Sequence, residues 1–274
     1  MSRLSDFVGT RDLAVNLTLR DLRSRYKRTL LGWTWSLLNP LAAVAIYSLV
    51  FSFFLKIEPP VGDPSGLQSF GLFLLCGLIP WTFFSNGLTM GMGTLIGNGN
   101  LIKKVYFPRE LLVFSAIASL VVTILIELSV LGVILLLVGN MVLPWIPVVL
   151  LLVVLLTGFV LGIALVLSVC NVYFRDVQHL VAIVLQVLFY TAPIVYPISY
   201  VPDEATVLGV TIPIGDIYRL NPLVTFIGAF RSVLYDLRFP PLGNLAYLVL
   251  WTGGLLVFGM WVFGRLDGRL AEEV

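Results

Sequence analysis

A short basic segment between two long uncharged stretches carries the most informative side chains of this chain. It runs Asn100-Leu101-Ile102-Lys103-Lys104-Val105-Tyr106-Phe107-Pro108-Arg109. A compact cationic turn between two apolar helices suits a complementary acidic surface on another protein. We therefore predict a docking loop over residues 98–110, whose contacts come from Asn100, Leu101, Lys103, Lys104, Val105, Tyr106, Phe107 and Arg109.

Groups that could do covalent or metal chemistry are scarce. His179 is the only histidine, and no His, Cys and carboxylate cluster has metal-ligand spacing. The chain has no Gly-x-x-x-x-Gly-Lys-[Ser/Thr] motif, which is the loop that cradles nucleotide phosphates. We therefore expect no catalytic residue, no metal and no cofactor on this chain. Any ATP and Mg²⁺ would be bound by a partner.

The composition is that of a membrane protein. Of 274 residues, 59% are hydrophobic and 12% charged, and the mean hydropathy is +1.01. Soluble domains carry about 25% charged residues. Membrane lipid is an expected partner and nucleic acid is not. Stretches long enough to span a bilayer, about 20 residues each, cover residues 34–55, 70–97, 111–138, 146–170, 177–198 and 244–264.

One carboxylate lies inside these stretches. Glu127 is their only formal charge, and a charge at the centre of a bilayer is costly and by default marks a functional site. The alternative is a neutral side chain with a structural hydrogen bond to a neighbouring Ser or Thr. Both interpretations stay open.

The positive charges predict the orientation. With a cytoplasmic N-terminus, 13 of the 17 Lys and Arg residues fall on the inner side, as the positive-inside rule requires. The outer side then holds Lys56, Arg219, Arg231 and Arg238. Both termini are therefore expected in the cytoplasm, with a charged tail over residues 265–274.

Residues 10–28 have the pattern of an amphipathic helix within a cytoplasmic interface segment, residues 1–33. Val15, Leu19 and Leu22 fall at helical spacing, so one face would lie in the membrane surface. Arg20 and Arg23 would then face lipid headgroups or the docked partner. Membrane anchoring and partner contact are compatible.

Two of the spans have distinctive side chains. In the first, Tyr47, Phe51 and Phe54 are spaced to share one helical face. The inner half of the second is rich in small residues and suits close helix packing. The third and fourth resemble ordinary lipid-facing scaffold.

The segment after the fifth span looks like a gate. Pro193 and Pro197 should break that span before it reaches the outer surface. Residues 199–243 are too long for a simple loop. Asn221 and Pro222 form a strong helix start, and the helix to Asp236 is only about half a bilayer long. A short apolar helix carrying Arg231 predicts a re-entrant element covered by protein or water.

Several motifs together resemble the type-2 ABC export permeases that move polysaccharides. The matches are residues 25–40, RYKRTLLGWTWSLLNP; residues 77–85, GLIPWTFFS; residues 101–110, LIKKVYFPRE; residues 173–176, YFRD; and residues 193–197, PIVYP. They occur in the family's order over nearly the whole chain. One departure is Leu112-Val113, where many relatives have a further proline.

The resemblance implies a fold and partners. Such permeases dimerise around a channel, bind two separate ATPase subunits and export lipid-linked glycans such as O-antigen, teichoic acid or cell-wall galactan precursors. The expected fold is an all-α membrane protein in a single domain, with a six-span bundle over residues 34–264, the interface helix and the outer gate between spans five and six.

A glycan needs such a channel because burying each unsatisfied hydroxyl costs roughly 4–8 kcal/mol. Aromatic rings offer flat apolar surface, with polar capacity in Tyr. The candidates for the channel wall are Tyr47, Phe51, Phe54, Phe189, Tyr190 and Tyr196. The alternative is that these rings face lipid or neighbouring helices.

Other functions fit less well. The nearest alternative is a drug or lipid exporter of the same superfamily. A secondary transporter usually needs several intramembrane ionisable groups. A membrane-embedded glycosyltransferase should show acidic pairs and histidines, and the loops have no convincing acidic pair.

Overall fold

The computed structural model describes residues 11–26, 34–54, 56, 59–105, 107–207 and 210–267. The predictions for Tyr106 and for the tail beyond Asp267 lie outside the described residues. So does the start of the interface segment.

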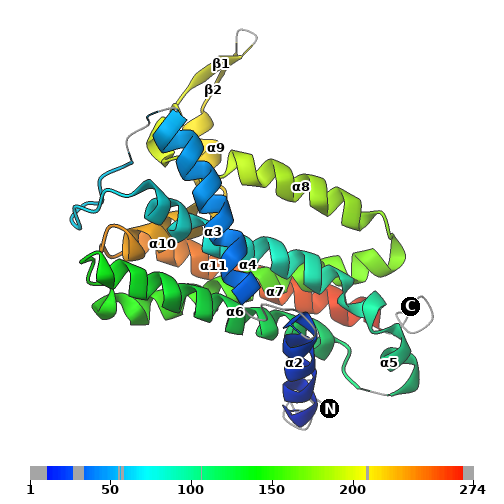
Figure 1. The fold of residues 1–274 in the computed structure, drawn as a ribbon. Coiled ribbons are helices and arrows are strands. Elements are labelled where there is room, and N and C mark those ends of the chain that lie inside the picture. The colour runs from blue at the N-terminus through cyan, green and yellow to red at the C-terminus, as the bar shows by residue number, and fades with distance from the viewer. Residues whose placement is uncertain are drawn as a thin grey trace.

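The described chain is helical apart from one small hairpin (Figure 1). Its elements are α2 (Arg11–Tyr26), α3 (Thr34–Ser48), the π-helix η1 (Leu49–Phe54), α4 (Phe70–Gly97), α5 (Gly99–Lys104), α6 (Glu110–Leu137), η2 (Leu143–Trp145), α7 (Ile146–Tyr173), α8 (Val177–Thr191), η3 (Ile198–Tyr200), β1 (Ala205–Val207), β2 (Val210–Ile212), α9 (Ile214–Arg219), α10 (Pro222–Leu234) and α11 (Leu242–Leu266).

Four of the described helices, α4, α6, α7 with the preceding η2, and α11, are long and apolar enough to cross a membrane. They form the packed body of the molecule, in which α7 lies against both α4 and α11 (Figure 1). The expectation that the fourth span is ordinary lipid-facing scaffold is therefore wrong. Its uniform Leu and Val content suits a buried helix as well as a lipid-facing one, so composition could not distinguish the two.

Small residues allow the close approach of these helices. A Cβ on Gly91 of α4 would lie 2.7 Å from the Cβ of Ala164 on α7. A Cβ on Gly162 of α7 would lie 2.6 Å from the main-chain oxygen of Leu255 on α11. The predicted close packing of the second span is confirmed at Gly87 and Gly91, whereas Gly93 and Gly97 face open space.

The remaining apolar helices are shorter. The first predicted span is formed by α3 and η1, and the fifth by α8, which ends at Thr191, two residues before Pro193. The predicted break of the fifth span is thus confirmed. Figure 1 shows α8 standing apart from the packed body, and Leu185 is its only buried side chain.

The segment between α8 and α10 departs from the all-α expectation. β1 and β2 pair antiparallel, with Thr206 opposite Thr211. The hairpin projects beyond the helices at the end of the molecule where α9 lies (Figure 1). Two three-residue strands are too short to produce an alternating pattern that sequence inspection would detect.

Candidate docking, channel and gate sites

The predicted docking loop forms a short helix at one end of the bundle. α4 ends at Gly97, and the main-chain N–H of the next residue, Asn98, donates to the carbonyls of Thr94 and Leu95 at 3.2 Å. α5 follows at once and turns the chain toward α6. Ile102 is buried and anchors α5 to the body of the protein, while Asn100, Lys103 and Lys104 are exposed. The two ammonium groups are therefore available to a partner.

A hollow of about 320 Å³ lies beside these lysines, between α5 and the start of α6. Its walls are Ile102, Lys103, Lys104, Val105, Phe107 and Arg109. The predicted docking residues differ in how accessible they are to a partner. Phe107 is buried, and Leu101 is half-buried. The reason is that a six-residue helix can present only one face outward.

Arg109 pairs with a residue of the same chain. Its Nη1 donates to Asp267 Oδ1 at 3.1 Å and also to the main-chain oxygen of Asp267. Only 18% of the Arg109 side chain is exposed. Arg109 thus joins the start of α6 to the end of α11. This pairing had no signal in the sequence, because the two residues are 158 positions apart.

The interface helix α2 meets this end of the bundle. It crosses α6 at a steep angle (Figure 1), and Leu17 is buried against the core. Arg20 Nη2 donates to Asn98 Oδ1 at 2.9 Å, and Arg23 is exposed. Val15 and Leu19 are exposed, which fits the predicted lipid face. α2 therefore brings its arginines to the turn that begins α5.

Aromatic rings from α3, η1, α4 and α8 meet in one group. The Phe189 ring lies 6.3 Å from Tyr47 and 5.6 Å from Trp81, centroid to centroid. We call this group the aromatic seam; its members are Tyr47, Phe51, Phe70, Trp81, Phe189 and Tyr190. The structure thus brings together four of the six predicted rings and adds Phe70 and Trp81, which sequence reasoning missed. Their partners come from distant elements, so no local spacing reveals them.

Two predicted rings lie elsewhere. Phe54 is 65% exposed and pairs with Phe53, so its expected place on one face with Tyr47 and Phe51 is wrong. The π-helix turns less per residue than an α-helix, which rotates Phe54 off that face. Tyr196 donates to the Tyr190 carbonyl at 3.0 Å, and its oxygen lies 3.2 Å from the Tyr218 hydroxyl. It ties the end of α8 to α9.

The predicted half-length helix is present as α10. The side chain of Asn221 caps it by accepting from Leu223 N at 3.0 Å, and Pro222 is the first helical residue. Most of its apolar residues are buried, as expected for a short helix covered by protein. Arg231 is 7% exposed and lies within this core.

A cavity of about 240 Å³ borders α10. Its walls include Ser232, Tyr235 and Asp236, with Pro193 and Pro197 from the segment after α8. Burial raises the pKa of Asp236 above its ordinary value, while a main-chain hydrogen bond at Asp63 and the charge of Arg231 oppose that rise. The cavity is thus lined by a carboxyl, hydroxyls and proline rings.

Glu127 lies on the buried face of α6 and is 5% exposed. It borders a gap of about 20 Å³ together with Leu41 of α3 and Leu75 of α4. Such a gap holds at most one water molecule. The position is compatible with both interpretations of this carboxyl, the functional one and the structural one.

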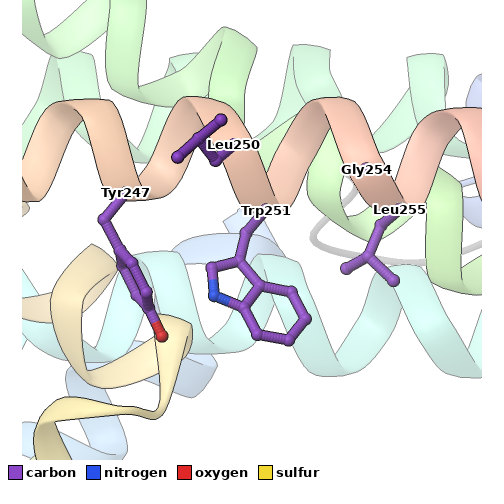
Figure 2. Close-up of a pocket in the computed structure, with 5 residues that line it drawn as sticks. All are labelled: Tyr247, Leu250, Trp251, Gly254 and Leu255. Carbon is purple, nitrogen blue, oxygen red and sulfur yellow. The ribbon is translucent and has the colours of Figure 1, made fainter.

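A further hollow of about 300 Å³ lies on α11, and apolar and aromatic residues make up most of its wall. Figure 2 shows its lining residues on a single helix: Tyr247, Leu250, Trp251, Gly254 and Leu255. The Tyr247 hydroxyl donates to the Leu220 carbonyl at 2.6 Å. Within the described ranges, no group of three or more His, Cys, Asp or Glu residues could hold a metal ion.

These features define a helical, multi-pass membrane protein with an exposed basic helix at one end and a short capped helix at the other. The model of the ABC-2 type transporter family matches residues 13–235. The chain belongs to this family.

Relatives match over nearly the full length. The chain is 30% identical to the O-antigen export system permease protein RfbA of Myxococcus xanthus, with 96% of each chain covered. It is 29% identical to the protein of the same name from Klebsiella pneumoniae, over 95% of this chain and 94% of the relative. Identity to the polysialic acid transport protein KpsM of Escherichia coli is 26%, over 90% of each chain.

Proposed function

We propose that this chain is the permease subunit of an ATP-driven exporter that moves a lipid-linked polysaccharide from the cytoplasmic to the outer face of the bacterial inner membrane. The observation that carries the proposal is full-length similarity to permeases whose names specify O-antigen and polysialic acid transport. Those names favour a glycan over a drug or lipid as cargo. The chain itself is a transport subunit, and ATP with Mg²⁺ would be bound by a separate ATPase.

The docking surface for that ATPase is proposed on α5 and α2. Lys103, Lys104 and Asn100 are exposed on α5, and Arg23 is exposed on α2. The 2.9 Å contact from Arg20 to Asn98 supports one continuous basic surface. An acidic or carbonyl-rich surface on the ATPase would complement it, and such charge pairing guides specificity and association.

The proposed topology has both termini in the cytoplasm and six spans in one membrane domain over residues 34–264. The four long helices supply four of the spans. α3 with η1 supplies the first and α8 the fifth. α10 then lies at the outer face as a re-entrant element, which is compatible with its buried apolar side chains.

A second copy of the chain is proposed to complete the channel. α8 carries a row of exposed apolar residues, namely Leu180, Ile183, Val184 and Val187. In a membrane these side chains face either lipid or another protein, and the proposal assigns them to a second permease. The aromatic seam would then lie beside the channel, where ring faces and tyrosine hydroxyls suit a passing sugar.

Deletion and complementation test this function. Cells lacking the gene should lose the surface glycan and accumulate lipid-linked glycan on the cytoplasmic side. A plasmid copy should restore export only when the partner ATPase is active. Normal surface glycan in the deletion strain would refute the proposal, provided that the strain holds no second exporter gene of this family.

A further inference from the structure

The outer end of α8 is held by ring contacts of Phe189 with Tyr47 and Trp81 and, just beyond the helix, by one buried side chain of α10. The helix stops at Thr191, and the chain continues through Ala192, Pro193 and Ile194, all of them buried. Pro193 has no N–H, and helix ends leave carbonyl groups without intrahelical partners. In an apolar surrounding, each unpaired carbonyl is costly. The last carbonyls of α8 accept from Ala192 N and from the Tyr196 hydroxyl. The buried Pro193 and Ile194 carbonyls beyond the helix therefore need another donor.

Arg231 of α10 supplies the donors. Its Nη1 donates to the Pro193 carbonyl and its Nη2 to the Ile194 carbonyl. Its Nε donates to the Phe73 carbonyl of α4 at 3.4 Å. The guanidinium also lies over the Phe73 ring, 3.7 Å from the centroid. One side chain thus connects α10, α4 and the segment after α8.

The position of the guanidinium depends on a glycine. A Cβ at Gly77, one turn after Phe73 on α4, would lie 2.8 Å from Arg231 Nη2 and 3.2 Å from Cζ. Its three nearest neighbours would all be guanidinium atoms. Because the tip of a long side chain yields more easily than a helix backbone, an added methyl group would push Arg231 away from its carbonyl partners.

We propose that Arg231 is a positioning residue that fastens the broken outer end of α8 to α4 and α10, so that α8 and the proposed gate helix α10 move as one unit. The protein covers α8 only in part, since Leu185 is its only buried side chain, and the Arg231 connection adds to the ring contacts that Phe189 makes with Tyr47 and Trp81. The inner end of α8 follows α7 through a tight turn, with Val177 N donating to the Phe174 carbonyl at 3.1 Å. Arg231 therefore adds a polar attachment just beyond the outer end of α8 to the ring contacts of Phe189 and to the tight turn at the inner end. The coupling to transport rests on the proposed function, whereas the fastening itself does not.

Hydrogen exchange on the full-length permease in lipid nanodiscs tests the fastening. In Arg231→Ala, amides of residues 189–196 should exchange at least about tenfold faster, because hydrogen bonds to charged groups are among the stronger ones in proteins. Amides in the middle of α6 should be unaffected. The matched control is Arg238→Ala, which removes an exposed arginine near α10 and should leave all regions unchanged. Unchanged exchange over residues 189–196 in Arg231→Ala would overturn the proposal.

Gly77→Ala gives a second test in which Arg231 itself is not substituted. This variant can be used if Arg231→Ala does not fold. It should accelerate exchange in the same residues. The double variant Gly77→Ala/Arg231→Ala should exchange no faster than Arg231→Ala, because the added methyl group then has nothing to displace. Additive effects of the two changes, or no effect of Gly77→Ala, would show that the glycine does not act through Arg231.

Export per assembled complex is the functional readout. It should fall at least about fivefold in Arg231→Ala at equal amounts of folded complex, a change that corresponds to about 1 kcal/mol. If Arg231→Ala exports at the wild-type rate although residues 189–196 exchange faster, Arg231 has only a local structural role, and the proposed coupling to transport is wrong. If the wild-type protein exports no glycan, the proposed function fails while the exchange result still decides whether the fastening exists.

Discussion

Arg109 Nη1 lies 3.1 Å from Asp267 Oδ1 and also donates to the main-chain oxygen of Asp267. This contact joins the end of the basic loop to the end of α11. The hollow beside Lys103 and Lys104 has Arg109 in its wall. Movement of the docking loop would therefore be transmitted to α11 as well as to α6.

Charge reversal at this contact gives the first prediction. Arg109→Asp should destabilise the protein by about 1–2 kcal/mol, because it loses a partly exposed ion pair and a main-chain hydrogen bond. Thermal unfolding in detergent should show a melting temperature lower by a few degrees. The exchanged pair Arg109→Asp/Asp267→Arg should recover part of the loss. No recovery would mean that the carboxylate contributes little and that the main-chain contact dominates.

The second prediction concerns the exposed lysines. Lys103→Glu/Lys104→Glu should fold normally, because both side chains are exposed. The amount of ATPase that co-purifies should fall at least about tenfold, since like charges placed against each other at an interface cost several kcal/mol. Arg238→Glu is the control, with a similar exposed charge at the proposed outer face. Normal co-purification and export in the lysine variant would mean that these lysines only set the membrane orientation through the positive-inside rule.

The third prediction concerns ATP. The purified permease should neither bind nor hydrolyse ATP, because its sequence has no Gly-Lys pair at all and so no phosphate-binding loop of that type. Activity should appear when the ATPase is added. Saturable hydrolysis by permease that mass spectrometry shows to be free of any partner would contradict the separate-ATPase proposal.

The fourth prediction places α10 at the outer face. Ser232 lines the cavity of about 240 Å³ next to α10, so a cysteine there should react with a membrane-impermeant thiol reagent added outside. Cys76 and Cys170, both free thiols, would first be changed to Ala. The rate should differ between resting and nucleotide-trapped complexes, because gate movement changes water access. Equal rates would indicate a static plug, and labelling only from the inside would reverse the proposed topology.

The fifth prediction tests the aromatic seam. Tyr47→Ala and Tyr190→Ala should each lower export several-fold at equal ATPase binding, because aromatic contacts are worth about 0.5–1.5 kcal/mol each. Phe258→Ala is the matched control, since Phe258 is half exposed on α11 and pairs with Trp261 away from the seam. An equal loss of export in the control variant would argue for a general effect on the membrane domain.

Local patterns predicted much of this protein. The short basic helix α5, the capped start of α10 at Asn221 and the end of α8 before Pro193 all follow from residues within one or two turns of each other. Helix caps, proline breaks and long apolar runs are local phenomena, so the sequence displays them directly. The predictions that failed also have physical reasons. Phe54 does not share a face with Tyr47 and Phe51 because η1 is a π-helix. The burial of α7 was not predicted because a uniformly apolar helix has no pattern that distinguishes a protein-facing side from a lipid-facing side.

The sequence by itself determined the membrane class, the family and the places where helices start and stop. Only the tertiary structure decided which side chains meet across long separations: Arg109 with Asp267, Phe189 with Trp81, and Arg231 with the carbonyls after α8. These contacts depend on how helices pack, and packing depends on shape complementarity between surfaces that are remote in sequence. A buried arginine in a short apolar helix signals that something must satisfy it, but the identity of its partners is a property of the folded chain alone.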